Sequence, residues 1–559
     1  MKRLLADWLK EPVYHLSRHN CLTVGDCVEG ISIIGATGSG KTSSSGRAIA
    51  VQMLRKGFGG LVLTAKADDL DTWLGYFREA ARDPQFDPDY QGDPAHYDPL
   101  QSGKLVVVGT KTLYKFNPID YEFRLAVDDA AATASSRLVS LFMSALGSGD
   151  GRGAGTDPFW ADALRELIAH AVDLALFAQA TVSTQGKLLL PTTPPSLQQL
   201  QDIIRSGPQS PEEARSQRWQ DSDALCPCFL RAAYQNFSAA QAGHVPRQEE
   251  LLGDLQDTFQ FWLKGFPGLA ERTRSVVVSS FTAKASGLLR APLRSLLCSE
   301  GEEACHPDAT PAATFHGQVV LINLPVKSFG EVGAFAQKLI KTVWQHATES
   351  NLRRVDQPCY PVFLWADEAQ HFLTPEDVLY QCTARSKLAS TVYLSQNLPN
   401  YHAQLGLHSS SATDALLGSL NVKIFHCNGE PTTNEWAERI FGTEESEEPQ
   451  KTETDSHMGN SGGSTSRTKV WRRIPYVPAY LFSELHRGGR PMGRSEAYLF
   501  MAGKSWKSCR RCDEQLTHKV VTQVMSGRGV KHLFLQYGDR QHCQPGKEDC
   551  CAVCVSQTP

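Results

Sequence analysis

The sequence has no apolar run long enough to cross a membrane, and this absence is the first constraint on its class. A spanning helix needs about 20 consecutive, mainly apolar residues. The longest candidate, around residues 167–182, is interrupted by His170 and Asp173. The first ten residues also lack the uninterrupted apolar segment of a secretory signal peptide. We therefore expect neither a membrane span nor a cleaved leader.

The sequence also lacks a strong charge of either sign. Its 56 basic and 60 acidic residues give a net charge of −4, which does not exclude nucleic-acid binding, because a motor can keep its basic residues in a local channel. The apolar content of 41% and the charged content of 21% are those of an ordinary globular protein. The 559 residues correspond to about three or four domain-sized units.

The 15 cysteines do not predict a disulfide framework, because no signal peptide accompanies them. Two C-x₂-C pairs stand near the C-terminus, 38 residues apart: Cys509, Cys512, Cys551 and Cys554. Four thiolates suit a tetrahedral zinc site. A loose tail that carries free thiols is the alternative, and the spacing of the pairs does not decide between the two.

The most informative stretch is residues 35–42, which fits the phosphate-binding pattern G-x-x-x-x-G-K-[ST] at every fixed position. Apolar residues before it predict a short buried strand, and the spacing after it predicts a helix from Ser43 to Lys56. In such a loop the backbone N–H groups point at a phosphate and the helix N-terminus adds positive charge. We expect Lys41 to reach the β- and γ-phosphates and the Thr42 hydroxyl to ligate Mg²⁺. The predicted nucleotide-binding residues are Gly35, Ala36, Thr37, Gly38, Ser39, Gly40, Lys41, Thr42 and Ser43.

Strand and helix patterns on both sides of this loop predict a mostly parallel sheet. Further strands are expected at residues 60–64, 104–109, 317–324, 361–366, 390–395, 421–426 and 496–500. Between the two groups only helical periodicity is found, which predicts an inserted all-α domain. The sheet is therefore expected to be built from both ends of the sequence.

These patterns divide the chain into five parts. We expect a lead-in over 1–28, the nucleotide-binding domain over 29–115 and 313–505, the all-α domain over 116–312 and a cysteine-rich tail over 506–559. Within the second part, residues 443–470 are acidic and then rich in Gly, Ser and Thr. This composition predicts a flexible loop.

An apolar strand that ends in Asp367-Glu368 is the expected partner of a phosphate-binding loop. We expect Asp367 to hold Mg²⁺ together with Thr42, and Glu368 to polarise the attacking water as general base. The acidic pair could instead cap the following helix, because carboxylates suit a helix N-terminus. Gln396 ends the neighbouring strand, where its amide could contact the γ-phosphate or be an ordinary polar strand end.

Some basic residues allow two interpretations each. Arg385 lies between the acidic pair and Gln396, and it could act as an arginine finger toward a neighbouring subunit's nucleotide or be solvated near a helix end. Four others could face a nucleic-acid channel, although such scatter is more typical of a solvated helix face. They are Lys338, Lys341, Arg353 and Arg354.

Taken together, these residues resemble the type IV coupling proteins, the TraG/TraD-like ATPases of conjugation and type IV secretion, within the FtsK–HerA group of ring motors. The resemblance covers roughly residues 25–505 and depends on the order and spacing of the motifs. These are the phosphate loop, Phe116-Asn117-Pro118, Asp157-Pro158-Phe159-Trp160, Trp365-Ala366-Asp367-Glu368 and residues 384–396.

The resemblance implies a RecA-like P-loop NTPase core with the inserted all-α domain, in a homo-hexameric ring that uses ATP and Mg²⁺. It implies a catalytic set of Lys41, Glu368 and Gln396, with Arg385 as the arginine supplied in trans. The implied partners are single- or double-stranded DNA or a relaxase–DNA complex, and a type IV secretion channel or other membrane partner. We expect a cytoplasmic protein that would reach the inner membrane peripherally, through such a partner.

Three departures from the family pattern leave other functions open. About 30 residues precede the loop where two membrane spans are usual, the second strand ends Thr64-Ala65-Lys66 in place of Asp-x-Lys, and the cysteine-rich tail is extra. The missing acidic contact is either lost or moved to Asp68. The alternatives are a soluble FtsK–HerA-type DNA translocase in DNA processing or defence, and a nucleotide-switched, substrate-recruiting adaptor with little turnover.

Overall fold

The computed structural model describes residues 5–17, 20–127, 131–146, 158–241, 249–350, 360–405, 410–454, 464–487, 494–504, 506 and 532–538. Within them a nine-stranded sheet has the order β15-β14-β11-β3-β10-β9-β4-β8-β5. Its strands are β3 (Ile31–Ile34), β4 (Gly59–Leu63), β5 (Leu105–Gly109), β8 (Val319–Asn323), β9 (Val362–Asp367), β10 (Ala389–Ser395), β11 (Val422–His426), β14 (Arg494–Met501) and β15 (His532–Gly538).

Seven neighbouring strands of this sheet, from β11 to β5, are parallel. β14 and then β15 extend the sheet in antiparallel pairing beyond β11. β10 separates β3, which leads into the phosphate loop, from β9, which ends in Asp367. The carboxyl ends of parallel strands share one edge, so the segments after β3, β10 and β9 meet there. This order confirms the predicted α/β class with a RecA-like, mostly parallel core.

Both faces of the sheet are covered, as a parallel sheet requires. Successive residues of one strand alternate between two apolar cores: Leu61 packs on one side and Val62 on the other. The Val62 side includes α3 (Arg47–Arg55), α4 (Asp69–Ala80) and the N-terminal elements α2 (Val24–Cys27), β1 (Pro12–Ser17) and β2 (Asn20–Thr23). The Leu61 side includes α17 (Val326–Ser350) and α18 (Glu376–Ala384). The chain before the loop thus packs in the same core as the nucleotide-binding strands.

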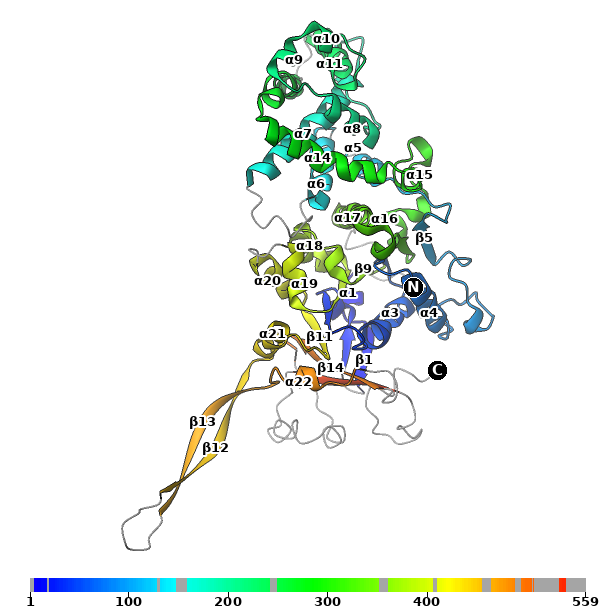
Figure 1. Ribbon diagram of the computed structural model, residues 1–559. Coiled ribbons are helices and arrows are strands. Elements are labelled where there is room, and N and C mark those ends of the chain that lie inside the picture. The colour runs from blue at the N-terminus through cyan, green and yellow to red at the C-terminus, as the bar shows by residue number, and fades with distance from the viewer. Residues whose placement is uncertain are drawn as a thin grey trace.

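The segment between β5 and β8 is helical and stands at one end of the molecule (Figure 1). Its longer helices are α5 (Pro118–Val127), α6 (Ala131–Leu146), α7 (Pro158–Ala178), α8 (Leu197–Ser206), α11 (Leu225–Gln241), α12 (Glu249–Gln260) and α14 (Glu271–Leu288), and its shorter ones are α9 (Pro211–Arg215), α10 (Gln217–Gln220), α13 (Phe266–Gly268), α15 (Leu293–Leu297) and α16 (Pro311–Thr314). The prediction of helices here is confirmed, with one small departure. β6 (Thr181–Val182) and β7 (Leu188–Leu189) form a short hairpin, whose turn contains Gly186 at φ 78°.

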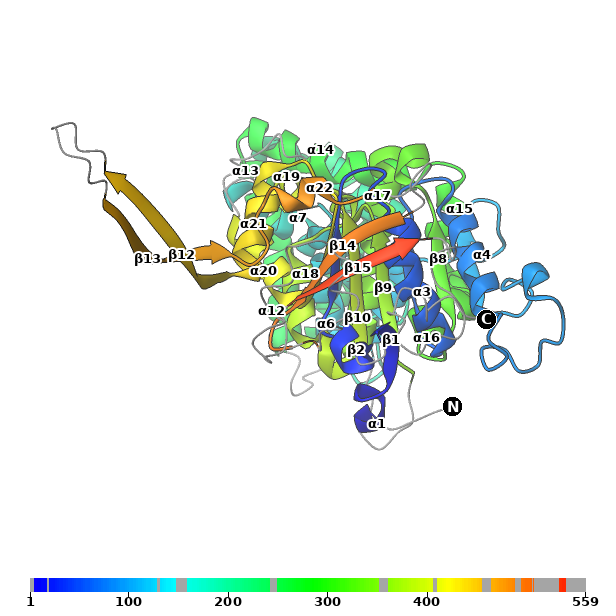
Figure 2. The ribbon, with the colours of Figure 1, turned by 90° about the horizontal axis from the view of Figure 1, so that it is seen from below.

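The prediction of a flexible loop over 443–470 is wrong for residues 443–454 and 464–470, which lie in paired strands, and residues 455–463 lie outside the described residues. β12 (Thr443–Thr454) and β13 (Ser464–Pro475) pair antiparallel along their whole length and project from the body as an arm (Figures 1 and 2). β12 is mainly acidic and β13 basic, and opposite charges across a strand pair stabilise it. Glu445 and Arg473 are one such pair, with Oε1 and Nε 3.6 Å apart. Composition alone concealed this complementarity between two segments.

In sequence order, four further helices come between β10 and β14: α19 (Leu398–Leu405), α20 (Ser410–Ser419), α21 (Pro431–Phe441) and α22 (Leu481–Glu484). Helix α1 (Leu5–Leu9) precedes β1. Among the described helices, none combines the length and the apolar character that a bilayer-crossing segment needs.

Candidate nucleotide site

The phosphate loop leaves β3 at the carboxyl edge of the sheet and is tied down from behind. The N–H of Gly35 donates to Ser395 O at 3.2 Å, and the N–H of Ala36 donates to Cys427 O at 2.9 Å. Gly38 and Gly40 have φ values of 74° and 89°, a left-handed backbone that glycine adopts without strain. The loop continues through a π-helical turn, Thr42–Gly46, into α3. This is the strand–loop–helix geometry that the motif requires.

Two side chains that no motif indicates brace this loop. Ser495 Oγ donates to Ser39 O at 3.1 Å, and it would lie 2.5 Å from a Cβ added to Gly40. His426 is fully buried, with Nε2 2.7 Å from Ser45 Oγ. Burial and the neighbouring charge of Lys41 lower the pKa of His426 to about 3, so its imidazole is neutral at physiological pH. Both residues come from C-terminal strands, which a local pattern cannot place against residue 40.

Thr42 and Asp367 meet beside the loop. Thr42 Oγ1 donates to Asp367 Oδ2 at 2.8 Å, and Asp367 is 5% exposed. Hydroxyl and carboxylate oxygens are the ligands that Mg²⁺ prefers. The two predicted metal ligands therefore lie together, and their chemistry fits the ion.

Glu368 follows Asp367 in a left-handed backbone conformation, with φ 56° and ψ 50°. Such conformations are costly for residues other than glycine and cluster at functional sites. Its side chain makes no capping bond to the turn that follows, Ala369–His371. Instead, Glu368 Oε1 lies 3.8 Å from the buried Nζ of Lys41. The geometry does not support the helix-capping alternative for Glu368.

Two amides hold the Glu368 carboxylate. Gln396 Nε2 donates to both carboxylate oxygens at 3.3 Å, and Gln370 Nε2 donates to Oε2 at 2.9 Å. Burial alone would raise the pKa of Glu368, but these bonds and the charges of Lys41 and Lys66 outweigh it, so the pKa is lower than usual. The carboxylate is therefore ionised at neutral pH. Gln370 was not predicted, because only its spacing of two from Glu368 distinguishes it.

Asp69, and not Asp68, is the acidic side chain that contacts the end of the second strand. Asp69 Oδ2 accepts from the N–H groups of Ala65 and Lys66, both at 2.8 Å, whereas Asp68 is exposed. Burial raises the pKa of Asp69 to about 6. The turn it holds directs Lys66 Nζ to within 3.5 Å of Asp367 Oδ2 and 3.7 Å of Glu368 Oε1. Lys66 is a second cation in the site.

Arg385 lies at the other edge of the sheet. It lies in the turn Arg385–Lys387, four residues before the first residue of β10, which has seven residues and ends just before Gln396. A rise of roughly 3.3 Å per residue along β10 puts Arg385 on the order of 20 Å from the site. Arg385 is 64% exposed and its Nη1 lies 3.0 Å from Glu29 Oε1. It cannot serve the nucleotide of its own chain, and a role in trans stays a prediction.

The other predicted basic and cysteine residues divide into two groups. Lys338 and Lys341 are 6% and 0% exposed, so neither a channel face nor a solvated face is correct for them. Arg353, Arg354 and the four cysteines of the C-x₂-C pairs lie outside the described residues. Within the described ranges, no group of three or more His, Cys, Asp or Glu side chains could hold a metal ion. The zinc prediction therefore stays untested.

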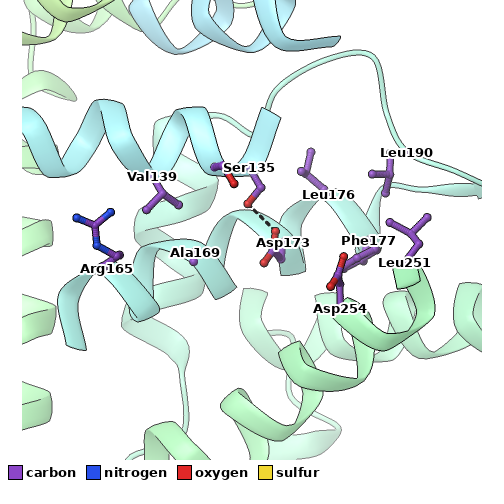
Figure 3. Close-up of a pocket in the computed structure, with 11 residues that line it drawn as sticks. Ser135, Val139, Arg165, Ala169, Asp173, Leu176, Phe177, Leu190, Leu251 and Asp254 are labelled. Atoms are coloured by element: carbon purple, nitrogen blue, oxygen red, sulfur yellow. Dashed lines mark hydrogen bonds between the residues drawn. The ribbon is translucent and has the colours of Figure 1, made fainter. Parts of the chain in front are cut away.

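A pocket of about 390 Å³ lies away from these residues, in the helical segment among α6, α7 and α12 (Figure 3). Apolar side chains such as Val139 and Phe177 line it, and Asp173 and Asp254 face it. Asp173 Oδ1 accepts from Ser135 Oγ at 2.6 Å. Burial raises the pKa of Asp173 from 3.8 to about 6.

This shift makes a prediction about stability. The folded chain binds the Asp173 proton more tightly than the unfolded chain, so stability is lost as pH rises from about 4 through about 6, by up to about 3 kcal/mol. Asp173→Asn is neutral at every pH and should avoid this loss. We expect its Tm to exceed that of the wild type by an amount that widens from pH 5 to pH 8. Asp308→Asn, at an exposed site, is the control, and a Tm gap that ignores pH would contradict the prediction.

Comparison with known proteins gives distant structural matches. No protein-family model and no curated protein sequence matches the chain. Among solved structures, the plasmid coupling protein TrwB in complex with the ATP analogue ADPNP is 13% identical with a TM-score of 0.49, over 90% of this chain and 89% of that one. TrwB with ADP and Mg²⁺ is 14% identical with a TM-score of 0.48, over 90% and 89%. VirB4 of Thermoanaerobacter pseudethanolicus is 12% identical with a TM-score of 0.38, over 77% and 87%. So distant a likeness leaves the function to be inferred from the residues of the site.

Proposed function

We propose that this chain is a P-loop ATPase that works as a hexameric motor of the type IV coupling protein kind and recruits and translocates DNA or nucleoprotein. The observation that carries the proposal is the ionised Glu368 carboxylate, held by Gln396 and Gln370 and 3.8 Å from Lys41. Beside it, Thr42 and Asp367 are joined at 2.8 Å. The order of the sequence motifs supports the coupling-protein kind.

In this proposal each residue has a distinct task. The loop N–H groups and Lys41 hold the phosphates of ATP, and Thr42 and Asp367 supply oxygens to Mg²⁺. When bound, the ion neutralises charge on the phosphate oxygens. Glu368 accepts the proton of the attacking water, because its carboxylate is ionised and lies at the loop. Before ATP binds, Lys41 and Glu368 offset each other's charge.

The hexamer would complete the site between subunits. Arg385 is exposed at the edge of the sheet opposite its own loop, which suits a side chain that acts on a neighbour's nucleotide. The proposed partners are DNA or a relaxase–DNA complex, and a secretion channel or other membrane partner.

Steady-state ATP hydrolysis with and without single- and double-stranded DNA tests the proposal. We expect DNA to raise the turnover of the wild type severalfold and to leave Glu368→Gln inactive, because stimulation must act through the general base. Stimulation by DNA without co-purification with membranes or channel components would favour the soluble translocase. Binding of ATP with negligible turnover in every condition would favour the adaptor and contradict the motor.

A further inference from the structure

An ion pair sealed inside the core beside the nucleotide site has no task in the proposal so far. Lys341 on α17 and Asp377 on α18 are 0% and 2% exposed, and Lys341 Nζ lies 2.6 Å from each oxygen of the Asp377 carboxylate. Nζ also donates to Phe372 O at 2.8 Å and to Thr374 Oγ1 at 3.1 Å. An ammonium group has three donors, so each of them finds an acceptor.

Burying two charges in a core carries a large desolvation cost. Burial lowers the pKa of Lys341, although Asp377 opposes the shift. Buried ion pairs can often be replaced by apolar side chains of similar volume without loss of stability. What apolar side chains cannot supply is a set of directional bonds to particular backbone and hydroxyl groups. The pair therefore fixes geometry more than it adds stability.

The geometry that it fixes is the turn that carries Glu368. Phe372, whose carbonyl Lys341 holds, is four residues beyond Glu368, and Asp377 Oδ2 accepts from the N–H of Thr374 at 2.8 Å. The turn begins at the left-handed backbone of Glu368, a conformation that persists only where the surrounding structure enforces it. The ion pair anchors the end of this turn.

The same carboxylate also contacts the strand that carries Gln396. Tyr393 OH donates to Asp377 Oδ1 at 3.1 Å. Tyr393 lies in β10, three residues before Gln396, whose amide holds Glu368. Asp377 thus contacts both segments that determine where the Glu368 carboxylate lies.

Helix α17 connects the ion pair to the helical segment. α17 packs against α5, α6 and α14 of that segment and against α18 of the core, and it lies between them (Figure 1). Gly330, at φ 58°, interrupts α17 near its start, and residues 331–350 form the continuous helix that carries Lys341. A displacement of this continuous part would move Lys341 and pull on Phe372 and Asp377.

We propose that the Lys341–Asp377 pair is a positioning element that sets Glu368 for hydrolysis and makes its position depend on helix α17, and through α17 on what the helical segment binds. This inference rests on the proposed ATPase function. Lys341, Asp377 and Tyr393 act through Glu368 and do not contact the nucleotide. They therefore control kcat and leave ATP binding unchanged.

The test compares kcat and KM for ATP in two variants of the full chain. Tyr393→Phe removes the bond between Asp377 and β10, and Lys341→Met/Asp377→Asn removes both charges while keeping the side-chain shapes. We expect kcat to fall severalfold in the first and about tenfold or more in the second, because small misplacements of a catalytic group are costly. KM for ATP should stay within about twofold of the wild type. Stimulation of turnover by DNA should weaken in the double variant.

Tyr97→Phe is the matched control. Tyr97 is 1% exposed, like Tyr393, and its OH donates to Asp87 Oδ2 at 2.7 Å, in the segment between α4 and β5; its kcat should equal that of the wild type. Wild-type kcat in Tyr393→Phe and in a folded double variant overturns the positioning role and leaves the ATPase proposal standing. If the double variant does not fold, an unchanged kcat in Tyr393→Phe is sufficient to overturn the positioning role. A wild type without turnover overturns both.

Discussion

Replacing Glu368 with Gln is expected to lower kcat for ATP hydrolysis by about 10²–10⁴-fold, the range for loss of a general base. Gln has the same shape, so the amides of Gln370 and Gln396, which lie 2.9 Å and 3.3 Å from Glu368, keep an oxygen to donate to. What is lost is the ionised oxygen that takes the proton of water. ATP affinity should stay close to that of the wild type, as phosphate-release assays and titration of a fluorescent nucleotide can show.

Glu79→Gln is the matched control for this experiment. Glu79 lies on α4 and pairs with Arg47 on α3, Oε2 to Nε 2.6 Å, away from the carboxylates of the site. A surface ion pair contributes about 0–1 kcal/mol, so turnover should be unchanged. Equal turnover in Glu368→Gln and Glu79→Gln would remove Glu368 from the reaction.

The second large effect is expected for Lys41→Ala. Lys41 is the buried lysine of the phosphate loop, and its Nζ lies 3.8 Å from Glu368 Oε1. Without it, the Glu368 carboxylate would face the phosphates of ATP with less positive charge between them. We expect turnover to fall by about 10²–10³-fold, as for other charge-stabilising groups. Unlike Glu368→Gln, this variant should also bind ATP weakly, and the nucleotide titration separates the two results.

Lys56→Ala provides the comparison for Lys41→Ala. Lys56 follows α3, and its Nζ lies 3.0 Å from Glu11 Oε1, so its loss removes one lysine without touching the loop. Turnover and ATP affinity should be those of the wild type. Normal ATP binding in Lys41→Ala would show that the phosphates of ATP do not lie at residues 35–42.

The sequence was a good guide wherever the signal is local. A window of about ten residues is enough to predict three of the site's elements. They are the phosphate loop, the strand that ends in Asp367-Glu368 and the strand before Gln396. Parallel pairing then brings these strand ends to one edge, so their meeting could be predicted from the strand pattern alone.

What the sequence concealed depends on contacts between distant segments. Ser495 braces the phosphate loop through its bond to Ser39, which stands 456 positions earlier in the chain. A lysine in a helix is expected at the surface. Lys341 is buried because it pairs with Asp377, which stands 36 positions away in the sequence. Opposite charges on β12 and β13 stabilise the arm. Taken alone, each of these segments has a composition that is ordinary for a loop.

The contact between Ser495 and the phosphate loop has a consequence for the synthesis of the protein on the ribosome. The loop leaves the ribosome long before Ser495 does, because 456 positions separate Ser39 from Ser495. At typical synthesis rates the interval is on the order of 20–90 s. During that time the nascent chain holds a loop without its support from Ser495 and His426, and β3 waits for its neighbours β10 and β11. The braced form of the nucleotide site can therefore arise only after His426 and Ser495 have both been synthesised.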